Sequence, residues 1–387
     1  MANVSSSNGL EKRPKLRFPG FDEPYKQCRI GDIYAERSQR GASDMELLSV
    51  TMNDGVKPRS EIEGKDNSSE DKSNYKIVRK GDMVYNSMRM WQGANGISPC
   101  DGIVSPAYTV LMPKQEINNG YFAAFFKSAN LINEFRKNSQ GMTSDTWNLK
   151  YPQIETIKIQ IPSVSEQDKV SELFGVLDAR IVAQAQLVES LKKYKRGLVK
   201  ALISGTVAFA GSENKRWETV RLAEIFTISA GGDIDRQNSS PTYSTSYPYP
   251  VYANALTNNG LYGYANYFKV EGDSITVSGR GEVGHAIARH CKYVPIVRLL
   301  SLVPKYEDDV DFFAYMINAT SIYIESTGVP QLTSPQLGAV KVFRPPILEQ
   351  KRISSLLLKI DAKIENEERL TFYLEKIRSS MLQQLFI

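Results

Sequence analysis

The sequence of 387 residues contains an internal repeat. Residues 162–203 align with residues 345–386 without a gap, and twelve of the 42 aligned pairs are identical. Both copies begin with the pattern P-x-x-x-E-Q, at residues 162–167 and 345–350. A repeat of this length indicates one structural unit used twice. The chain is therefore expected to fold into two similar halves rather than into one continuous domain.

The segments that precede these two stretches match more weakly, at an offset of 191 residues. The Gly-Asp pair at 81–82 aligns with that at 272–273, and Arg89 with Arg280, within the shared pattern G-D-x6-R-x3-G. The sequence around this pattern has diverged much more than the two C-terminal stretches. We therefore predict the order domain, helix, domain, helix, with Arg89 and Arg280 at matching positions of the two domains.

Both C-terminal stretches have a heptad pattern of apolar residues, which is typical of helices that pack on another helix. Some 40 residues at about 1.5 Å each form a rod of roughly 60 Å, too long for the core of one compact domain. We predict that the two helices pack on each other, with each helix packing on its own domain as the alternative. The predicted helix–helix packing residues are Val170, Phe174, Leu177, Ile181, Val188, Leu191, Leu198, Leu202, Ile353, Leu357, Ile360, Ile364, Leu374, Met381 and Leu385.

The predicted fold class is two mixed α/β (α+β) domains, related by a pseudo-twofold axis and separated by two long antiparallel α-helices that form a coiled coil. Strand-like and helical runs alternate in each domain, between loops rich in Gly, Asn and Ser. Two apolar runs rich in β-branched residues, 103–112 and 295–303, are strand-like. The predicted boundaries are 1–161 for the first domain, 162–205 for the central helix, 206–343 for the second domain and 344–387 for the C-terminal helix.

The composition excludes several classes of protein. With 41% hydrophobic residues the chain can build real cores, so wholesale disorder is excluded. Three cysteines are too few for a disulfide framework, which favours a reducing, cytoplasmic location. No apolar run of about eighteen residues occurs, and the first residues lack an apolar signal core. We therefore expect neither a membrane span nor a secretion signal.

Residues 279–284 fit the pattern G-x-G-x-x-G after a predicted strand, as a dinucleotide-binding turn would. The sequence that follows reaches Pro295 too soon for the usual crossover helix. The corresponding part of the first domain keeps only Arg89 and the last glycine. We expect a structural loop here, with a phosphate-binding turn as the alternative.

A second grouping of chemically active residues lies in the first domain. Asp54, Glu63 and Lys65 form a loose D…E-x-K arrangement, as in metal-dependent nucleases, but in a hydrophilic loop where such matches arise by chance. No phosphate-binding loop ending in G-K-[ST] and no N-P-P-[YF] tetrapeptide occurs. The sequence therefore offers no positive sign of catalysis.

The only two histidines of the chain, His285 and His290, lie close to Cys291. These are metal-ligand types, but a spacing of five does not place the two histidines on one helix face, and a fourth ligand is missing. We expect no metal site and no catalytic residue in this chain.

Net charge gives only weak support for nucleic-acid binding. The chain carries +5, but residues 1–160 hold 22 basic and 19 acidic residues, and residues 206–343 hold 11 and 13. A DNA-binding second domain would depend on a few Arg, Asn and Gln side chains at base edges. The candidate DNA-binding residues are Arg89, Gln92, Asn95, Asn254, Asn258, Asn259 and Arg280. The alternative is that these are exposed loop residues without a ligand, and that the two arginines are structural.

These features together resemble the specificity subunit of a type I restriction-modification system. The resemblance rests on residues 16–21, 81–86 and 101–108 in the first domain, on 278–281 in the second, and above all on P-x-x-x-E-Q before each long helix. It covers nearly the whole chain. One departure is Asp168, which stands where a basic residue is usual, whereas Lys351 in the second copy fits.

The resemblance implies that each domain is a target recognition domain that reads one half of a bipartite, asymmetric site in double-stranded DNA. It also implies that the chain has no activity of its own and recruits two methyltransferase (modification) subunits and endonuclease (restriction) subunits. The methyltransferase subunits would methylate adenine N6. No cofactor is expected on this chain, since S-adenosylmethionine and ATP would bind the partners. The alternatives are a non-catalytic protein-interaction scaffold, with two modules on a coiled coil, and an enzyme whose active site the sequence does not reveal.

Overall fold

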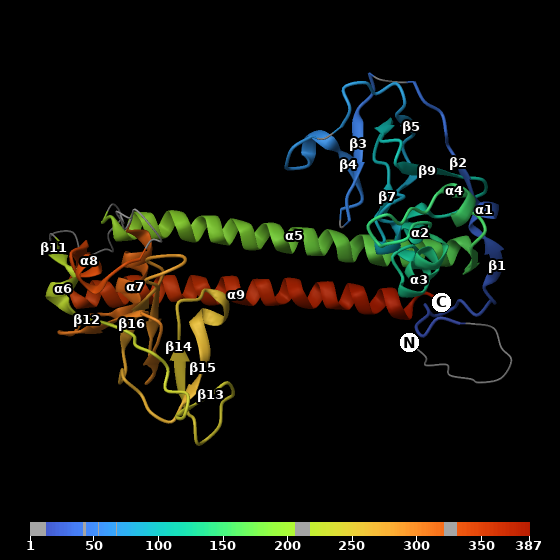
Figure 1. The fold of residues 1–387 in the computed structure, drawn as a ribbon. Helices are drawn as coiled ribbons and strands as arrows, with labels where there is room; N and C mark the ends of the chain where they lie inside the picture. The colour runs from blue at the N-terminus through green and yellow to red at the C-terminus, as the bar shows by residue number, and fades with distance from the viewer. Residues whose placement is uncertain (1–12, 42–43, 53, 67, 206–216, 321–330) are drawn as a thin grey trace. The chain divides into compact units, whose positions relative to one another are not determined.

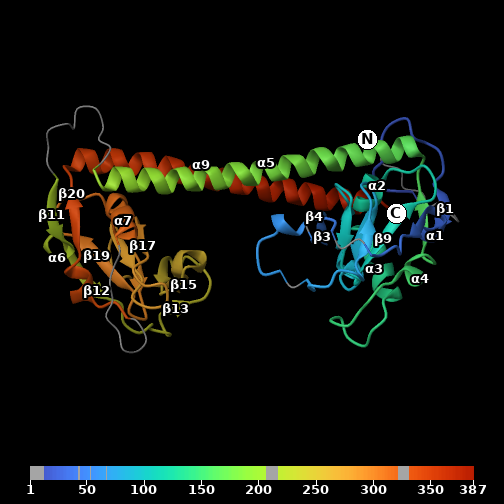
Figure 2. The ribbon, with the colours of Figure 1, turned by 90° about the horizontal axis from the view of Figure 1, so that it is seen from above.

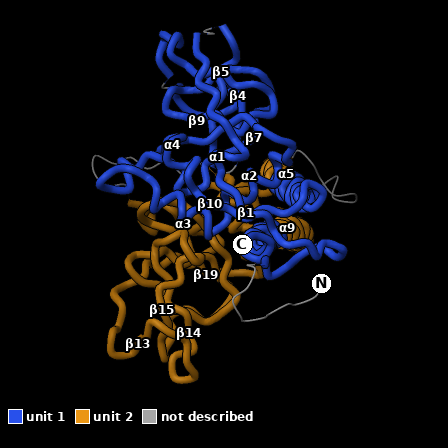
Figure 3. Tube along the Cα trace, turned by 90° about the vertical axis from the view of Figure 1, so that its right-hand side faces the viewer, with its two compact units in different colours: residues 1–185, 369–387 blue, residues 186–368 orange. Residues whose placement is uncertain are grey.

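The computed structural model describes residues 13–41, 44–52, 54–66, 68–205, 217–320 and 331–387 (Figure 1). The chain divides into two compact units, which are coloured separately in Figure 3. Unit 1 comprises Met1–Ala185 with Arg369–Ile387, and unit 2 comprises Gln186–Glu368. Each unit contains one mixed α/β domain and parts of both long helices, so the predicted fold class of the domains is confirmed. The predicted start of the second domain, residue 206, lies outside the described residues.

Unit 1 is built from short strands and helices. In chain order they are β1 (Lys26–Arg29), α1 (Ile30–Ile33), β2 (Tyr34–Glu36), β3 (Leu47–Val50), β4 (Val56–Pro58), η1 (Arg59–Glu61), β5 (Lys76–Val78), β6 (Met83–Asn86), η2 (Met90–Gln92), β7 (Asn95–Ile97), β8 (Gly102–Val104), β9 (Tyr108–Pro113), α2 (Asn119–Phe125), α3 (Ala129–Asn138), α4 (Tyr151–Ile154) and β10 (Lys158–Ile161). The inner sheet, β2-β9-β6-β7, is antiparallel. In the outer sheet, β4-β3-β8-β5, strands β3 and β8 are parallel. Strands β1 and β10 form a separate ribbon.

The inner sheet of unit 1 is buried on both faces because successive side chains of a strand point to opposite sides. On β6, Met83 and Tyr85 join the core formed with α2 and the long helices. Val84 between them packs in the other core, with outer-sheet residues Leu48 and Val104. The helices, the inner sheet and the outer sheet therefore form three successive layers within this unit (Figure 1).

Unit 2 contains a closely related set of elements. They are β11 (Glu218–Arg221), α6 (Leu222–Ile225), β12 (Phe226–Ala230), β13 (Ser239–Ser240), β14 (Tyr249–Tyr252), η3 (Thr257–Gly260), β15 (Leu261–Ala265), β16 (Ser274–Val277), β17 (Ala286–Arg289), β18 (Val294–Pro295), β19 (Leu300–Pro304), α7 (Val310–Ala319), α8 (Ser334–Gly338) and β20 (Lys341–Arg344). The inner sheet has the order β12-β19-β16-β17 and the outer sheet β13-β15-β14-β18. Strands β11 and β20 lie side by side as the ribbon (Figure 2).

The two units share one topology near the long helices and differ further away. The inner sheets correspond strand for strand, as do the ribbons. In the outer sheets, β4-β3-β8 corresponds to β15-β14-β18, with the parallel pair β3·β8 matched by β14·β18. The fourth strand differs, because β5 joins beside β8 in unit 1, whereas β13 joins beside β15 in unit 2. The outer sheet is therefore the part of the repeat that has diverged.

The layer between the inner and outer sheets also differs. In unit 1 this layer combines apolar residues with Lys76 of β5, which is 8% exposed and whose Nζ donates to Glu36 Oε1 of β2 at 3.1 Å. Unit 2 instead places Arg289 of β17 there, 7% exposed. The Arg289 Nε donates to Thr276 Oγ1 at 2.9 Å, and its guanidinium carbon lies 3.7 Å from the centre of the Tyr252 ring. Burial lowers the pKa of Arg289, and nearby tyrosines oppose that effect. The hydrogen bond and the cation–π contact offset the cost of burying this charge.

The long helices α5 (Val164–Ile203) and α9 (Ile347–Gln384) run antiparallel within each unit. In unit 1, Asp178 of α5 forms an ion pair with Arg378 of α9. In unit 2, Asp361 of α9 forms an ion pair with Lys195 of α5. Asp361 and Arg378 are the equivalents of Asp178 and Lys195 at the 183-residue offset, so the same contact occurs once in each unit with the helices exchanged.

None of the fifteen predicted packing residues is exposed. Those that are buried are Val170, Phe174, Val188, Leu202, Ile353, Leu357, Ile364 and Leu385, and the other seven are half-buried. Val170, Phe174 and Leu385 belong to the core of unit 1, and Leu202, Ile353 and Leu357 to that of unit 2. The ends of the helices thus pack on the α/β domains, which was the alternative that the sequence left open.

The glutamines of P-x-x-x-E-Q make the same two hydrogen bonds in each unit. Gln167 donates to the carbonyl oxygen of Pro162 at 3.0 Å and accepts from the backbone N–H of Asn118, also at 3.0 Å. Gln350 makes both bonds at 2.8 Å, to Pro345 and from Asp309. Asn118 and Asp309 are the N-cap residues of α2 and α7. The pattern therefore joins the start of each long helix to the N-terminus of α2 in unit 1 and of α7 in unit 2.

Each of the two strand-like runs contains two strands. Residues 103–112 divide between β8 and β9, and residues 295–303 divide between β18 and β19. In both units the first strand belongs to the outer sheet and the second to the inner sheet. The chain must bend where it crosses between the sheets, although residues with strand propensity stand on both sides of the bend.

Candidate functional site

The loops that follow β6 and β16 contain the two predicted arginines, but strand pairing shifts their alignment. Met83 pairs with Leu111 on β9, and Ile275 pairs with Leu302 on β19. Leu111 and Leu302 lie 191 residues apart, whereas Met83 and Ile275 lie 192 apart. Since all four side chains belong to the core next to the long helices, the structural offset in this strand is 192.

The prediction that Arg89 and Arg280 occupy matching positions is therefore wrong by one residue. The carbonyl oxygens of Ser87 and Gly279 each accept a hydrogen bond from the leucine two residues before α4 or α8, at 2.8 and 2.9 Å. Ser87 thus corresponds to Gly279, and Arg280 corresponds to Met88. Alignment of the two Gly-Asp pairs at an offset of 191 residues therefore misses a shift of one residue. Only the strand pairing shows this shift.

In unit 1, Arg89 and Gln92 lie on an exposed turn around η2. Trp91 lies between them in sequence, and its ring contacts the Trp147 ring edge-on with centroids 5.1 Å apart. The Arg136 guanidinium lies 5.7 Å from the Trp91 ring centre. A surface of arginine, amide and aromatic side chains suits nucleic-acid contact, because bases can hydrogen-bond and stack on it. Sequence reasoning missed the two tryptophans, although aromatic residues within stretches rich in glycine and asparagine could have pointed to them.

Asn95 does not lie on this surface. It begins β7, is 1% exposed, and donates through Nδ2 to the carbonyl oxygen of Gly93 at 3.0 Å. Its Oδ1 is buried and has no hydrogen-bond partner among the described residues. Asn95 therefore has no surface to offer a nucleobase. The sequence around it resembles a loop because glycine precedes and follows it closely.

In unit 2, Arg280 is exposed and is held by Gln331. The Arg280 Nε and Nη2 donate to Gln331 Oε1 at 3.2 and 2.9 Å. Asn254 is half-buried and joins two loops, because its Oδ1 accepts from the N–H of Gly279 at 2.8 Å and its Nδ2 donates to the carbonyl oxygen of Val297. Asn254 thus holds loops in place, while Arg280 presents its side chain at the surface.

Asn258 and Asn259 are exposed and both have left-handed backbone conformations, with φ of 51°. Asparagine tolerates this conformation better than most residues. The Nη2 of buried Arg289 donates to the carbonyl oxygen of Asn259 at 2.7 Å, which fixes the loop from below. These two amides are therefore presented on a held backbone, as recognition of base edges requires.

Val297 and Arg298 form a second left-handed pair, with φ of 50° and 61°. They lie where the chain crosses from β18 to β19. A β-branched residue in this conformation is unusual, and sparsely populated backbone conformations cost about 1–3 kcal/mol each. Together with the two asparagines, these are the only non-glycine residues with positive φ in the described parts of the chain. No sequence signal marks this pair.

The G-x-G-x-x-G stretch is a structural loop, as expected. A strand, β17, follows it instead of the helix that a dinucleotide-binding turn requires. A Cβ on Gly279 would lie 3.0 Å from the carbonyl oxygen of Arg298, and Gly281 and Gly284 have φ of 72° and 88°. Each glycine of the pattern therefore has a backbone reason for its position.

The other candidate chemistries find no geometry to support them. Asp54 pairs with Lys57 at 3.2 Å, while Glu63 and Lys65 are exposed. Among the residues that the structure describes, no group of three or more His, Cys, Asp or Glu side chains could hold a metal ion. Within the same residues, no helix has the length and apolar character that crossing a bilayer requires.

His290 bridges two carboxylates instead of joining a metal site. Its Nδ1 lies 2.8 Å from Asp273 and its Nε2 lies 3.1 Å from Asp311. Partial burial disfavours the charged imidazole, but Asp273 and Asp311 outweigh that effect and raise the pKa of His290 above its ordinary value. Protonated His290 therefore links the turn before β16 to the first turn of α7.

We predict that this link weakens as the pH rises. Because the pKa is raised in the folded state, its stabilising contribution is complete below the ordinary histidine pKa of about 6.5 and disappears as the pH passes the raised value. Half-exposure of the side chain limits the effect to less than about 1 kcal/mol. Urea denaturation between mildly acidic and mildly alkaline pH should show a steeper loss for the wild type than for His290→Asn. Equal slopes would contradict the bridge.

The model of the type I restriction modification DNA specificity domain matches the chain twice, at residues 23–193 and 214–376. A putative type I specificity subunit of Mycoplasma pneumoniae is 25% identical over 207 residues, which cover 53% of this chain and 55% of that protein. A second one from the same organism is 30% identical over 145 residues, covering 38% of this chain and 42% of that protein. The matched stretches thus span about half the length of these relatives.

Solved structures show the same fold. The S subunit of a type I restriction-modification system from M. genitalium aligns over 97% of this chain and 99% of its own, with a TM-score of 0.62 and 16% sequence identity. The HsdS subunit from Thermoanaerobacter tengcongensis aligns over the same shares, with a TM-score of 0.53 and 16% identity. The chain is therefore similar in fold along nearly its whole length, although its sequence has diverged widely.

Proposed function

The chain belongs to the family of type I restriction-modification DNA specificity proteins, and we propose that it is the DNA-recognition subunit of such a system. Each α/β domain would bind one half of a bipartite, asymmetric target in double-stranded DNA. The observation that carries this proposal is the pattern of divergence between the two units. The inner sheet, the ribbon and the helix start are shared, whereas the outer sheet and the exposed loops differ. A constant frame with variable loops suits two readers of different sequences.

We propose further that the chain is not catalytic and that it recruits the subunits that catalyse the reactions. Two methyltransferase subunits would modify adenine N6 with S-adenosylmethionine, and ATP-dependent restriction subunits would complete the endonuclease in the cytoplasm. Modest net charge supports this division of roles, because partners can supply many of the phosphate contacts on which affinity depends. Another solved structure of similar fold addresses the structural basis of complex assembly and conformational transition in the type I R-M system.

Selection from a random duplex pool tests this proposal. The chain is mixed with its candidate methyltransferase partner, and bound duplexes are sequenced after repeated rounds. Enrichment of two short, different sequences separated by a fixed gap supports a two-domain reader. Failure to enrich any sequence, at low salt and with the partner present, favours the protein-interaction scaffold. Turnover by the isolated chain would instead show an enzyme.

We predict that Arg280→Ala weakens binding in one half-site only. An arginine that reads guanine contributes about 1–3 kcal/mol of discrimination, which is roughly a 5- to 150-fold change in affinity. Fluorescence anisotropy with duplexes altered at each position of the selected motif measures this change at fixed salt. Lys341→Gln, which removes an exposed charge from β20 of the same domain, is the matched control. An equal loss on every duplex would show that Arg280 does not read a base.

A further inference from the structure

The crossing between β18 and β19 carries two outward side chains that do not serve the core. Val297 is 49% exposed, and Arg298 is exposed. The guanidinium of Arg298 has neither a hydrogen bond nor an ion pair within the described parts of the chain. The flanking residues Ile296 and Leu299 are buried, so the chain turns outward only at this pair. We call these two residues the crossing tip.

The crossing tip is held rigidly by backbone contacts. The N–H of Val297 donates to the carbonyl oxygen of Gly232 at 2.9 Å, and the N–H of Arg298 donates to that of Gly231 at 3.0 Å. A Cβ on Gly231 would lie 2.6 Å from the carbonyl carbon of Pro295, so only glycine permits this close approach. The left-handed conformation is therefore imposed by surrounding chain rather than preferred by the two residues themselves.

The crossing tip adjoins the loop of Arg280. The carbonyl oxygen of Arg298 lies 3.0 Å from where a Cβ of Gly279 would stand, and Gly279 directly precedes Arg280. Asn254 joins the two loops through its hydrogen bonds to Gly279 and Val297. Arg280 and the crossing tip thus belong to one continuous surface whose backbone positions are fixed relative to each other.

The corresponding crossing in unit 1 lacks these features. There the chain passes from β8 to β9 through Ser105, Pro106 and Ala107, and none of the three has a positive φ. Their side chains are small and carry no charge. The crossing tip is therefore particular to unit 2, and it lies in the part of the repeat that distinguishes the two domains.

We propose that the crossing tip is a specificity-determining contact with duplex DNA in the half-site of unit 2, an inference that rests on the proposed function. Arginine donates to the acceptor edge of guanine, and a branched apolar side chain contacts the methyl group of thymine. The backbone conformation is unfavourable for both residues, and glycine would adopt it freely. Since neither side chain repays this cost by packing inside the domain, a ligand outside it explains why such residues stand here.

Glycine variants separate a DNA contact from a folding role. Arg298→Gly and Val297→Gly remove the side chains while relieving the backbone, so the thermal midpoint should be unchanged or higher. The complex of the full chain with its methyltransferase partner should bind the selected duplex roughly tenfold more weakly when Arg298 is replaced. The loss should be confined to one base pair, where the variant no longer discriminates among the four bases.

Three results would overturn the inference. They are unchanged affinity, an equal loss on every duplex with a weaker salt dependence, and a lowered thermal midpoint. Unchanged affinity would show that Arg298 does not contact DNA. An equal loss on every duplex would show that Arg298 contacts a phosphate instead of a base. A lowered thermal midpoint would show that the crossing tip stabilises the fold. Lys341→Gln controls for loss of one positive charge and should keep full discrimination. A wild-type complex that selects no sequence at all would count against the proposed function itself.

Discussion

Exchange of residues 206–343 for the second domain of another family member is expected to replace one half of the preferred DNA sequence and to leave the other half unchanged. The reason is that each unit has its own inner sheet, outer sheet and exposed loops, with its own cores. Specific binding exceeds non-specific binding by about 4–10 kcal/mol in typical DNA readers. If each half-site supplies half of this free energy, about 2–5 kcal/mol, the preference for the exchanged half-site is roughly 30- to 4,000-fold.

Selection from the random duplex pool measures both halves in one experiment. The reciprocal exchange of residues 1–161 is the matched control and should replace the opposite half. The two chimaeras should keep the same gap between the halves, because both retain residues 162–205 and 344–387. If either exchange altered both halves, the two domains would not read DNA independently.

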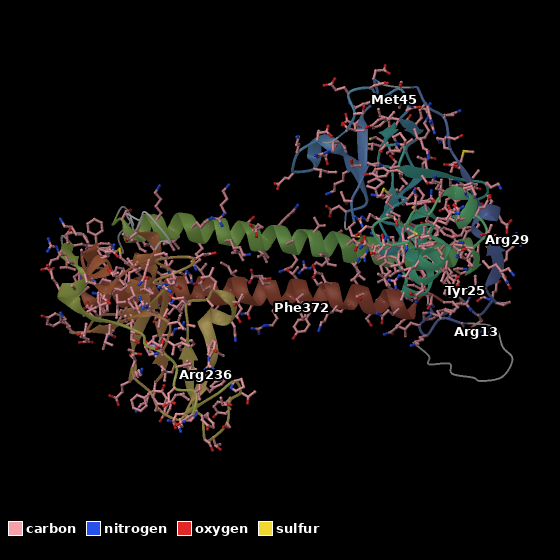
Figure 4. The ribbon with its side chains drawn as sticks, in the orientation of Figure 1. Arg13, Tyr25, Arg29, Met45, Arg236 and Phe372 are labelled. Carbon is pink, nitrogen blue, oxygen red and sulfur yellow. The ribbon has the colours of Figure 1, made fainter. Side chains whose placement is uncertain are left out.

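The second large effect is expected in unit 1, where Glu166 of the P-x-x-x-E-Q pattern is 1% exposed. It accepts from Arg17 Nε and Nη2 at 2.9 and 2.8 Å and from the hydroxyl of Tyr25 at 3.2 Å. Figure 4 shows Tyr25 beside the ends of the long helices in unit 1. Burial and the Glu166 carboxylate raise the pKa of Tyr25, which keeps the phenol protonated as a donor.

Glu166→Ala is expected to destabilise unit 1 by about 3–5 kcal/mol, because it leaves a largely buried guanidinium without its carboxylate. The side chain of Arg17 is only 14% exposed, so water cannot easily replace the lost partner. Urea denaturation followed by circular dichroism measures the loss. Hydrogen exchange at the β1–β10 ribbon assigns it to this unit. A loss below about 1 kcal/mol would contradict a structural ion pair here.

The repeat provides an internal control for this experiment. Glu349 is the equivalent of Glu166, is 6% exposed, and accepts from the indole N–H of Trp217 at 3.1 Å. Because its donor is neutral, Glu349→Ala leaves no buried charge unpaired and should cost only about 1 kcal/mol. Equal losses for the two variants would show that the charge of Arg17 is unimportant.

The sequence predicts the long helices well because their packing follows a local period. The heptad pattern places Val188 and Ile364 inside without any knowledge of the rest of the fold. It also predicts two mixed domains, since repetition and the alternation of strand-like and helical runs are properties of neighbouring residues. The pattern could not decide whether the helix ends also pack on the domains, because domain surfaces are assembled from distant segments.

The candidate site was less accessible to prediction because it depends on strand pairing. The strand pairing shifts the alignment of β6 with β16 by one residue. The structural equivalent of Arg280 is therefore Met88, although the sequence patterns align Arg280 with Arg89. The left-handed backbone of Val297 is imposed by Gly231 and Gly232, which are remote in sequence. Asn95 shows the same limit, since its burial in β7 follows from the sheet rather than from its glycine-rich neighbourhood.

Sequencing of methylated adenine across a genome tests most directly whether the two domains read two halves of one target. DNA is compared between a host that makes the chain with its methyltransferase partner and the same host that makes the partner alone. A two-domain reader predicts N6-methyladenine in both parts of one interrupted, asymmetric sequence, and only when the chain is present. Methylation at an uninterrupted sequence, or an identical pattern without the chain, would contradict it.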